Sequence, residues 1–457
     1  MTLTVLSDHQ VHTLLEGLDL DELDQFRCVL AEALHEFSTN ADADGLYQQP
    51  HRLTTRNSVS GATTLYMPVN GPEGVGCKVV SLPSPNDSSE NPSQGRLGRP
   101  TGIVNILSPA GEPLGLVHAS TLTAFRTALG SACLLNRRSQ VKTITVFGSG
   151  TQAYWHVRLA LMMRGSTIKH VNIINRRFSE NASNILKSLT AIPLAVSERE
   201  GWSTAKFGIL TPTFHEYHRL LKEQVRSADV IYCCTPSRED LFDASILTSH
   251  EGRKKGRLIV AVGSYTPDMR ELPEGLLVQA TKQHDGSRRH FHKHAGEAGV
   301  IVVDSLDGVL KEAGEIISAK INPNQMVELG ELVMLNRLAV AESETSTPGI
   351  HTPSSSTEHD YFDNRLSVST LLGDPPRSPI SPPTQSRKPS LHLPFRKSSS
   401  TSLDSERNKK EDSLARWLRD GTVVYKSVGL ALMDLVVGLH LVKLANSKGI
   451  GTRIQDF

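Results

Sequence analysis

Apolar residues recur at helical spacing near the amino terminus, at Leu14, Leu15 and Leu18 and again between Phe26 and Phe37. Positions three and four apart share one face of a helix, so this stretch predicts amphipathic helices. Short β-branched runs bounded by Gly and Pro follow and predict strands. These strands are expected at Thr63–Met67, Gly76–Ser81, Gly102–Leu107 and Pro113–His118.

From Ser120 the pattern changes to apolar strands that alternate with helices. Helices are predicted at Ser120–Asn136 and Gln152–Arg164, and strands at Thr143–Phe147, His170–Asn175, Asp229–Cys234, Arg257–Val262 and Gly299–Val303. Strands that are apolar on both sides and separated by helices are typical of a parallel sheet covered on both faces. The predicted fold class is α/β.

Two polar segments interrupt these patterns. Ser and Pro make up roughly a third of residues 345–412, too few apolar groups for a packed core, so we expect a disordered insert. The helical pattern resumes at Leu414, which makes the segment an insertion and not a tail. Its Ser-Pro steps fit a kinase or an adaptor as partner. A second polar loop carries His290, His292 and His294; a solvated loop is favoured over a metal site there, and no metal site is expected.

Composition excludes several classes of protein. The 457 residues carry a formal net charge of +1, which excludes an extended basic surface for nucleic acid. The five cysteines show no CxxC spacing, which argues against a thiolate metal site or a disulfide framework. No apolar run is long enough for a membrane span, and no signal peptide is visible. We therefore expect a cytoplasmic protein that binds neither nucleic acid nor membrane.

A dinucleotide-binding motif stands between the strand at Thr143–Phe147 and the helix that follows. Gly148, Gly150 and Ala153 satisfy the GxGxxG/A spacing. The first glycine permits a tight turn, the second lets the backbone approach a pyrophosphate, and the alanine allows close packing of helix on strand. The next strand ends in Asn175-Arg176-Arg177 where an NAD site usually has an acidic residue. Arginine there meets a 2′-phosphate, so NADP(H) is favoured, with NAD(H) as the alternative.

Six segments together resemble the ornithine cyclodeaminase/mu-crystallin family. They are Leu65-Tyr-Met-Pro, Gly76-Cys-Lys, Leu122-Thr-Ala-Phe-Arg-Thr-Ala, Val146-Phe-Gly-Ser-Gly-Thr-Gln-Ala, Val302-Val-Asp-Ser with Glu312-Ala-Gly-Glu, and Lys426-Ser-Val-Gly-Leu-Ala. The resemblance implies a Rossmann-type NAD(P)-binding domain at 121–344. It also implies an α+β substrate-binding and dimerisation domain formed by 1–120 and the returning 414–457, a homodimer, and an active site between the domains.

The same resemblance assigns roles to particular residues. Arg52 and Arg126 correspond to the pair that grips a substrate carboxylate, with Arg56 as a competitor for the first position, and Lys78 corresponds to the active-site lysine. A planar guanidinium suits a carboxylate because it donates two parallel hydrogen bonds. Residues assigned to the cofactor are Thr127, Gly148, Ser149, Gly150, Thr151, Gln152, Asn175, Arg176, Arg177, Thr235, Val262, Gly263, Ser427, Val428 and Gly429. Asp304 and Glu315 are expected to play structural roles.

One departure bears on the reaction. Cyclodeaminases of the family carry an Asp two residues before a proline near the cofactor, whereas this chain has Tyr265 there and Asp268 after Pro267. That arrangement is closer to mu-crystallin and favours reduction of a small cyclic ketimine, an amino-acid-derived carboxylate, with NADPH. Lys78, Tyr265 and Asp268 are the candidate catalytic residues. Two alternatives stay open: an ornithine cyclodeaminase that forms L-proline and ammonia with bound NAD, and a non-catalytic NADP(H)-binding regulatory protein.

Overall fold

The computed structural model describes residues 2–39, 46–83, 100–282, 299–332 and 415–457. The Ser/Pro-rich insert and the three alternating histidines lie outside the described residues. Two sheets organise the described chain. The first carries the amino-terminal strands together with the last strand, and the second carries the dinucleotide motif.

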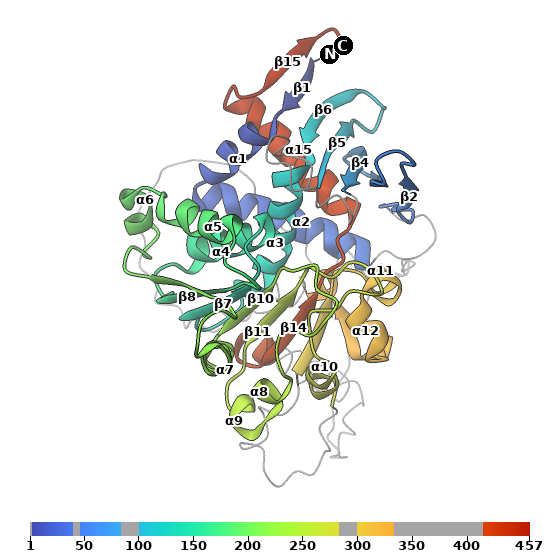
Figure 1. Ribbon diagram of the computed structural model, residues 1–457. Helices are drawn as coiled ribbons and strands as arrows, with labels where there is room; N and C mark the ends of the chain where they lie inside the picture. Colours follow the sequence, from blue (N-terminus) through green and yellow to red (C-terminus); the bar gives the residue numbers. More distant parts are fainter. Residues whose placement is uncertain (1, 40–45, 84–99, 283–298, 333–414) are drawn as a thin grey trace, which may run out of the picture. The chain divides into compact units, whose positions relative to one another are not determined.

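The first sheet has seven strands in the order β15-β1-β6-β5-β4-β3-β2. Their bounds are β1 (Thr2–Leu6), β2 (Leu53–Arg56), β3 (Thr63–Gly71), β4 (Gly74–Leu82), β5 (Thr101–Leu107), β6 (Pro113–His118) and β15 (Thr452–Gln455). Neighbours pair antiparallel except β1 and β6, which are parallel. The pairing of β1 with β15 brings the two ends of the chain side by side (Figure 1).

Four helices form the core together with this sheet: three contact its strands, and the longest packs on two of the other helices. They are α1 (Asp8–Glu16), α2 (Leu20–Thr39), α3 (Ala119–Leu135) and α15 (Ala431–Ser447). Helix α15 packs directly on β3, β4, β5 and β6. Close approach is possible because glycines face it: a Cβ on Gly115 would lie 2.7 Å from Val442, and one on Gly76 would lie 3.2 Å from Leu435. Helix α3 also packs on α4 (Thr151–Arg164) and so joins the two sheets.

The second sheet has eight strands, all parallel, in the order β13-β12-β14-β11-β10-β7-β8-β9. Their bounds are β7 (Thr143–Phe147), β8 (His170–Ile174), β9 (Lys206–Leu210), β10 (Val230–Cys233), β11 (Leu258–Ala261), β12 (Gly299–Val303), β13 (Met326–Glu328) and β14 (Thr422–Lys426). The strand order reverses between β7 and β10, and this reversal is where nucleotides bind in open α/β sheets.

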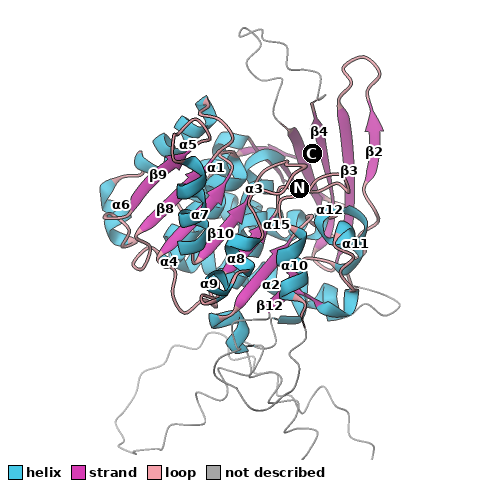
Figure 2. Cartoon of the chain, turned by 60° about the horizontal axis from the view of Figure 1, so that its bottom comes forward, coloured by secondary structure: helices cyan, strands magenta, loops and turns pink. Residues whose placement is uncertain are grey.

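Helices cover both faces of the second sheet (Figure 2). They are α4, α5 (Glu180–Thr190), α6 (Leu194–Arg199), α7 (Tyr217–Ser227), α8 (Ser245–Thr248), α9 (His250–Arg253), α10 (Glu274–Ala280), α11 (Leu306–Glu312) and α12 (Gly314–Ser318), with 3₁₀ turns at Pro323–Gln325 and Leu329–Leu332. Successive residues of β10 enter two different cores: Val230 and Tyr232 face one, Ile231 and Cys233 the other. This double burial explains why the strands read as continuous apolar runs.

The structure confirms the α/β class and requires one correction to the expected division of the chain. Residues 414–457 were expected to belong wholly to the first, substrate-binding part. Instead β14 inserts between β11 and β12 of the second sheet, and only α15 and β15 return to the first. The reason is that Thr422–Lys426 is buried on both sides, with Val423 and Tyr425 in one core and Val424 in the other, as in a central parallel strand.

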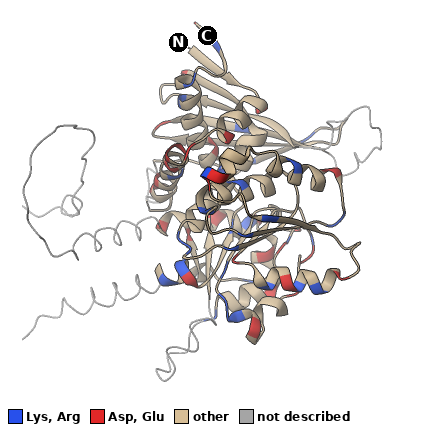
Figure 3. Ribbon diagram, turned by 90° about the vertical axis from the view of Figure 1, so that its left-hand side faces the viewer, with Lys and Arg blue, Asp and Glu red and all other residues tan. Residues whose placement is uncertain are grey.

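The described surface has no dominant charge. Basic and acidic residues are interspersed along the helices in the view of Figure 3, in keeping with the net charge near zero. Within the described ranges, no helix is long and apolar enough to cross a membrane, and no three His, Cys, Asp or Glu side chains come together as metal ligands.

Candidate functional site

The residues assigned to a cofactor gather at one edge of the second sheet. Because all its strands are parallel, their carboxyl ends share one edge. Gly148 follows β7, Asn175 follows β8, Thr235 follows β10, Val262 follows β11 and Ser427 follows β14. Five segments that span about 280 positions of the chain are thereby brought to the edge where ligands bind in such sheets.

The glycine loop has the geometry that a bound pyrophosphate needs. Gly148 has a φ of +102°, and a Cβ there would lie 2.8 Å from the carbonyl oxygen of Cys234, so only glycine fits. Gly150 begins α4 without a side-chain cap, and nothing lies within 4 Å of where its Cβ would be. Ala153 is fully buried against the sheet. The first amides of α4 therefore face open space, where they and the helix dipole can receive a phosphate.

The other residues assigned to the cofactor near this loop differ in how exposed their side chains are. Thr151 is exposed, and Ser149 and Gln152 are half-buried at the start of α4. Thr127 lies in α3, where its buried hydroxyl donates to the carbonyl of Thr123 at 2.8 Å. Ser149, Thr151 and Gln152 are placed to reach a ligand at this edge, while Thr127 can contribute mainly through packing.

The turn after β8 presents two arginines. The amide of Asn175 donates to Leu210 at 3.0 Å, and its side chain donates to the carbonyl of Arg177 at 2.9 Å, which holds the turn. The side chains of Arg176 and Arg177 are exposed, and neither guanidinium makes an ion pair with any described residue. In dinucleotide-binding folds, residues at this position contact the ribose 2′-hydroxyl of NAD or the 2′-phosphate of NADP.

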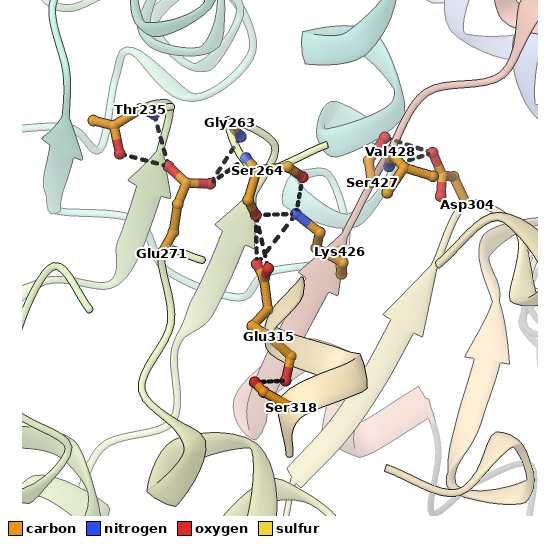
Figure 4. A network of polar contacts seen from close by, with 10 residues as sticks. All are labelled: Thr235, Gly263, Ser264, Glu271, Asp304, Glu315, Ser318, Lys426, Ser427 and Val428. Carbon is orange, nitrogen blue, oxygen red and sulfur yellow. Dashed lines mark hydrogen bonds and ion pairs between the residues drawn. The ribbon is translucent and has the colours of Figure 1, made fainter. Parts of the chain in front are cut away.

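Buried Glu271 ties two loops of the cofactor edge together (Figure 4). One carboxylate oxygen accepts from the amide of Thr235 at 2.7 Å and from its hydroxyl at 2.9 Å. The other accepts from the amides of Gly263 at 2.8 Å and Ser264 at 3.3 Å. Burial raises the pKa of Glu271 to about 6. A single side chain thus fixes the ends of β10 and β11 relative to one another.

A second buried network lies beside it. Lys426, at the end of β14, donates to the carbonyl oxygen of Ser264 at 2.6 Å and lies 3.1 Å from the carboxylate of Glu315. Asp304 accepts from the Ser427 hydroxyl at 2.7 Å and from the amide of Val428 at 3.0 Å (Figure 4). It also accepts from the amide of Gly429 at 2.7 Å, and so holds the loop after β14. These buried contacts are the kind that the predicted structural roles of Asp304 and Glu315 require.

Three side chains of the first part form a buried ionic cluster. Asp434 of α15 accepts from Lys78 Nζ of β4 at 2.7 Å through one oxygen, and from Arg126 Nε of α3 at 3.0 Å through the other. Lys78 and Arg126 are 4% and 3% exposed. Burial lowers the pKa of Lys78 to about 8, against the opposing effect of the Asp434 charge.

Arg126 is adjacent to the cofactor edge. Gly429 has a φ of +87°, and a Cβ on it would lie 2.9 Å from a terminal nitrogen of Arg126. The same Gly429 is held by Asp304. Arg126 Nη1 donates to Met433 Sδ at 3.5 Å, and no oxygen of the described residues accepts from either terminal nitrogen. The free edge of the guanidinium is suited to a carboxylate.

Arg52 and Tyr265 lie near this cluster. Arg52 forms an ion pair with Glu312 of α11, and burial lowers its pKa while the nearby charges of Asp304 and Arg126 act on it in opposite directions. Burial raises the pKa of Tyr265, and the nearby positive charge of Arg52 acts in the opposite direction. The structure therefore brings Arg52, Lys78, Arg126 and Tyr265 together.

Asp268 lies apart from Arg52, Lys78 and Arg126, although its charge contributes to the raised pKa of Tyr265. Its carboxylate is 56% exposed, pairs with Arg238 at 3.0 Å and accepts from the Thr266 hydroxyl at 2.5 Å, a bond that lowers its pKa. In the described chain no contact joins Asp268 to Lys78, Arg52 or Arg126. Its position after Pro267 turns it toward the surface, and this placement does not favour a catalytic role. Arg56, the competitor of Arg52, is exposed in the edge strand β2.

Three carboxylates of the site were not found from the sequence. Neither Glu271 nor Glu312 was given a role from the sequence, although Glu312 begins the family segment Glu312-Ala-Gly-Glu. Asp434 carries a local signal, since it is the sole acidic residue in the apolar run Ala431–Val442. A lone charge on an otherwise apolar helix is buried only when it is paired, which could have marked it as a partner for buried cations.

Comparison with known proteins places this fold and site. No family model matches the chain. An uncharacterized protein of Saccharomyces cerevisiae is 25% identical over 366 residues, which is 75% of this chain and 90% of the relative. A delta(1)-pyrroline-2-carboxylate reductase of Bacillus thuringiensis is 29% identical over 268 residues, or 56% and 71%. The ketimine reductase mu-crystallin of Rattus norvegicus is 27% identical over 237 residues, or 51% and 59%.

Solved structures share the fold over nearly the whole chain. The delta(1)-pyrroline-2-carboxylate reductase of Thermococcus litoralis, in complex with NADH and L-proline, has a TM-score of 0.60 at 19% identity and covers 99% of this chain and 100% of its own. An archaeal alanine dehydrogenase dimer with bound NAD has a TM-score of 0.59 at 17% identity, with 100% of both chains covered. A probable ornithine cyclodeaminase of Bordetella pertussis has a TM-score of 0.57 at 16% identity, with 98% and 99% covered. The motifs and the named relatives together support the ornithine cyclodeaminase/mu-crystallin family for this chain, and the solved structures share its fold.

Proposed function

We propose that this protein is an NAD(P)-dependent imine reductase that reduces a small cyclic ketimine carboxylate with NADPH. The proposal is supported by relatives named as pyrroline-2-carboxylate and ketimine reductases. The observation that carries it is the position of Arg126. Its free guanidinium edge lies against Gly429, on a loop that Asp304 holds at the cofactor edge of the second sheet. A carboxylate gripped there would be held next to a bound dinucleotide.

Binding and orientation are the tasks of the two arginines. Arg126 offers its two terminal nitrogens to the substrate carboxylate, and Arg52, held by Glu312, adds a second guanidinium from the segment before β2. Bidentate, charge-assisted bonds fix both the position and the angle of the substrate. Reduction needs the imine carbon within about 3–3.5 Å of the hydride donor, so orientation contributes directly to the rate. NADPH, when bound, supplies the hydride.

The imine nitrogen must receive a proton as the carbon receives the hydride. Lys78 is the favoured donor because its pKa of about 8 leaves it protonated at neutral pH and close to the operating range that suits a general acid. Tyr265 is the alternative donor. Its raised pKa keeps the hydroxyl protonated, and the charge of Arg52 counteracts that effect of burial.

NADPH is proposed over NADH because of the turn after β8. Arg176 and Arg177 are exposed and lack acidic partners among the described residues, which leaves them available for a 2′-phosphate. The amides at the start of α4 would hold the pyrophosphate.

A homodimer is part of the proposal. The face of the first sheet opposite α15 carries apolar side chains in register, with Val5 beside Leu116 and Val79 between Tyr66 and Ile103. Tyr66 and Ile103 are 36% and 41% exposed. Exposed apolar side chains on a sheet face favour a covering partner, and a second copy is the partner we propose. Light scattering should give twice the chain mass, and Ile103→Lys should shift it to the monomer.

A screen of NADPH oxidation against cyclic imino acids of different ring size tests the reaction. Stoichiometric oxidation with one of them supports the reductase. Ammonia release from ornithine without net change in the cofactor would support the cyclodeaminase instead. Cofactor binding without turnover of any substrate would support a non-catalytic role.

A further inference from the structure

Asp434 contacts both cations that the proposed reaction uses. Its carboxylate is 1% exposed, and its two oxygens accept from Lys78 Nζ at 2.7 Å and from Arg126 Nε at 3.0 Å. A carboxylate repels the carboxylate of a substrate, and both oxygens of Asp434 are already engaged by cations. Asp434 can act only through the two cations it holds.

The engagement of Arg126 is one-sided. Asp434 takes Nε and leaves the terminal nitrogens without an oxygen acceptor in the described part of the chain. The backbone of Gly429 lies against those nitrogens and keeps the guanidinium plane in place. Asp434 therefore aims the free edge of Arg126 without competing for it.

Lys78 is faced by charges from three directions. Asp434 comes from α15, Arg126 from α3 and Arg52 from the segment before β2. The two guanidinium groups and burial favour the neutral amine, and Asp434 is the negative charge that favours the ammonium. Lys78 can serve as a proton donor only while the ammonium form persists.

We propose that Asp434 is a positioning residue of the reductase site, which holds the Lys78 ammonium and the Arg126 guanidinium side by side so that one delivers a proton while the other grips the carboxylate. This inference rests on the proposed function. Hydride passes to the imine carbon, the C=N π pair takes a proton from Lys78 Nζ, and the products are the cyclic amine, NADP⁺ and neutral Lys78. Water then returns the proton to the lysine.

The test compares neutral and charged replacements of Asp434. Asp434→Asn removes the charge at nearly constant size, and Asp434→Glu retains it. For the wild type, kcat/KM measured against pH should fall on the alkaline side near the pKa of Lys78, about 8. In Asp434→Asn this limb should move to lower pH by about one unit or more, as expected for loss of an opposite charge in direct contact. In Asp434→Glu it should stay close to the wild-type position.

A purely structural ion pair predicts a different result. Asp434→Asn would then lose activity by the same factor at every pH, in proportion to its unfolded fraction, and that outcome overturns the proposal. Melting temperature and NADPH affinity are measured on the same preparations. If Asp434→Asn does not fold, Asp434→Ser, whose smaller hydroxyl can still accept a hydrogen bond, replaces it. Lys78→Met should abolish the alkaline limb if that limb belongs to the lysine.

Binding of a planar, non-reducible carboxylate tests the role of Asp434 independently of whether the proposed reaction occurs. The probe is pyrrole-2-carboxylate, titrated into the NADP⁺-loaded protein between pH 6 and pH 10. Its affinity should fall as Lys78 loses its proton, and that fall should begin at lower pH in Asp434→Asn. If no imine is turned over but this shift is seen, the proposed reaction is wrong and the role of Asp434 stands. If the binding profiles of the two proteins coincide, the role of Asp434 is refuted.

Discussion

Two glycines of one loop should respond in opposite ways to the same added methyl group. Gly148→Ala forces an alanine into a backbone with a φ of +102° and places its Cβ 2.8 Å from a carbonyl oxygen of Cys234, which belongs to the backbone and cannot turn away. The conformation alone costs about 1–2 kcal/mol, and relief of the close contact adds to that cost. We expect a fall in melting temperature on the order of 5 °C.

Gly150→Ala meets none of these penalties. Gly150 has φ −85° and ψ −174°, a conformation open to any residue, and its Cβ would have no neighbour within 4 Å. Alanine is a poorer N-cap than glycine, but it also lowers the entropy of the unfolded chain, and the two effects of about 0.5–1 kcal/mol offset each other. The methyl group instead occupies the space that a pyrophosphate would use. Loss of one hydrogen bond to a charged group, about 1.5–3 kcal/mol, weakens NADPH binding by about tenfold to a hundredfold.

Thermal unfolding and NADPH fluorescence titration of the two variants, on matched preparations, give the measurement. The expected pattern is a stability loss for Gly148→Ala and an affinity loss at near wild-type stability for Gly150→Ala. Wild-type NADPH affinity in Gly150→Ala would show that the start of α4 does not hold the phosphates. A melting temperature in Gly150→Ala as low as in Gly148→Ala would show that the loop is structural only.

Three further outcomes are expected. Arg126→Lys keeps the charge but loses the planar fork, so kcat/KM for the ketimine should fall on the order of tenfold or more while NADPH affinity stays unchanged; an unchanged kcat/KM in a folded variant would remove Arg126 from the site. Arg176→Asp should weaken NADPH binding far more than NADH binding, and an equal loss for both would contradict the assignment of the 2′-phosphate. Replacing residues 345–412 by a short Gly/Ser linker should leave melting temperature and NADPH affinity nearly unchanged. The chain on both sides of the segment is held without it, since Arg137 donates to the Leu332 carbonyl at 2.6 Å and Arg138 to the Gly421 carbonyl at 2.8 Å. Aggregation of the shortened chain would show that the segment packs.

Local chemistry explains why much of the fold could be predicted from the sequence. The glycine loop can be predicted from the sequence because the conformation and space that require Gly148 and Gly150 are set by the backbone close to them. The strand at Thr143–Phe147 and the helix after it were placed almost to the residue because their apolar patterns differ sharply from the turn between them. The pairing of β1 with β15 at the chain ends left no such signal, since each is a short strand paired with a partner more than 440 positions away.

The ionic cluster of the site was only partly predictable for the same reason. Arg126 and Lys78 stood out through their motifs, but the side chain that joins them is 308 and 356 positions away along the chain. No local pattern specifies which buried cation an acidic residue of α15 will meet. Asp268 shows the converse case: its sequence neighbourhood pointed to the active site, whereas its exposed carboxylate pairs with Arg238.

In the proposed function, the Arg126 cluster holds the substrate and the glycine loop holds the cofactor for one reaction, hydride transfer to a cyclic ketimine carboxylate. The most direct measurement follows NADPH absorbance with the purified full chain and a series of cyclic imino acids, with product identified by mass. We expect oxidation of one NADPH for each cyclic amino acid formed, and loss of that activity in Arg126→Lys at unchanged NADPH affinity. NADPH that binds but is never oxidised by any imino acid in the series would contradict it.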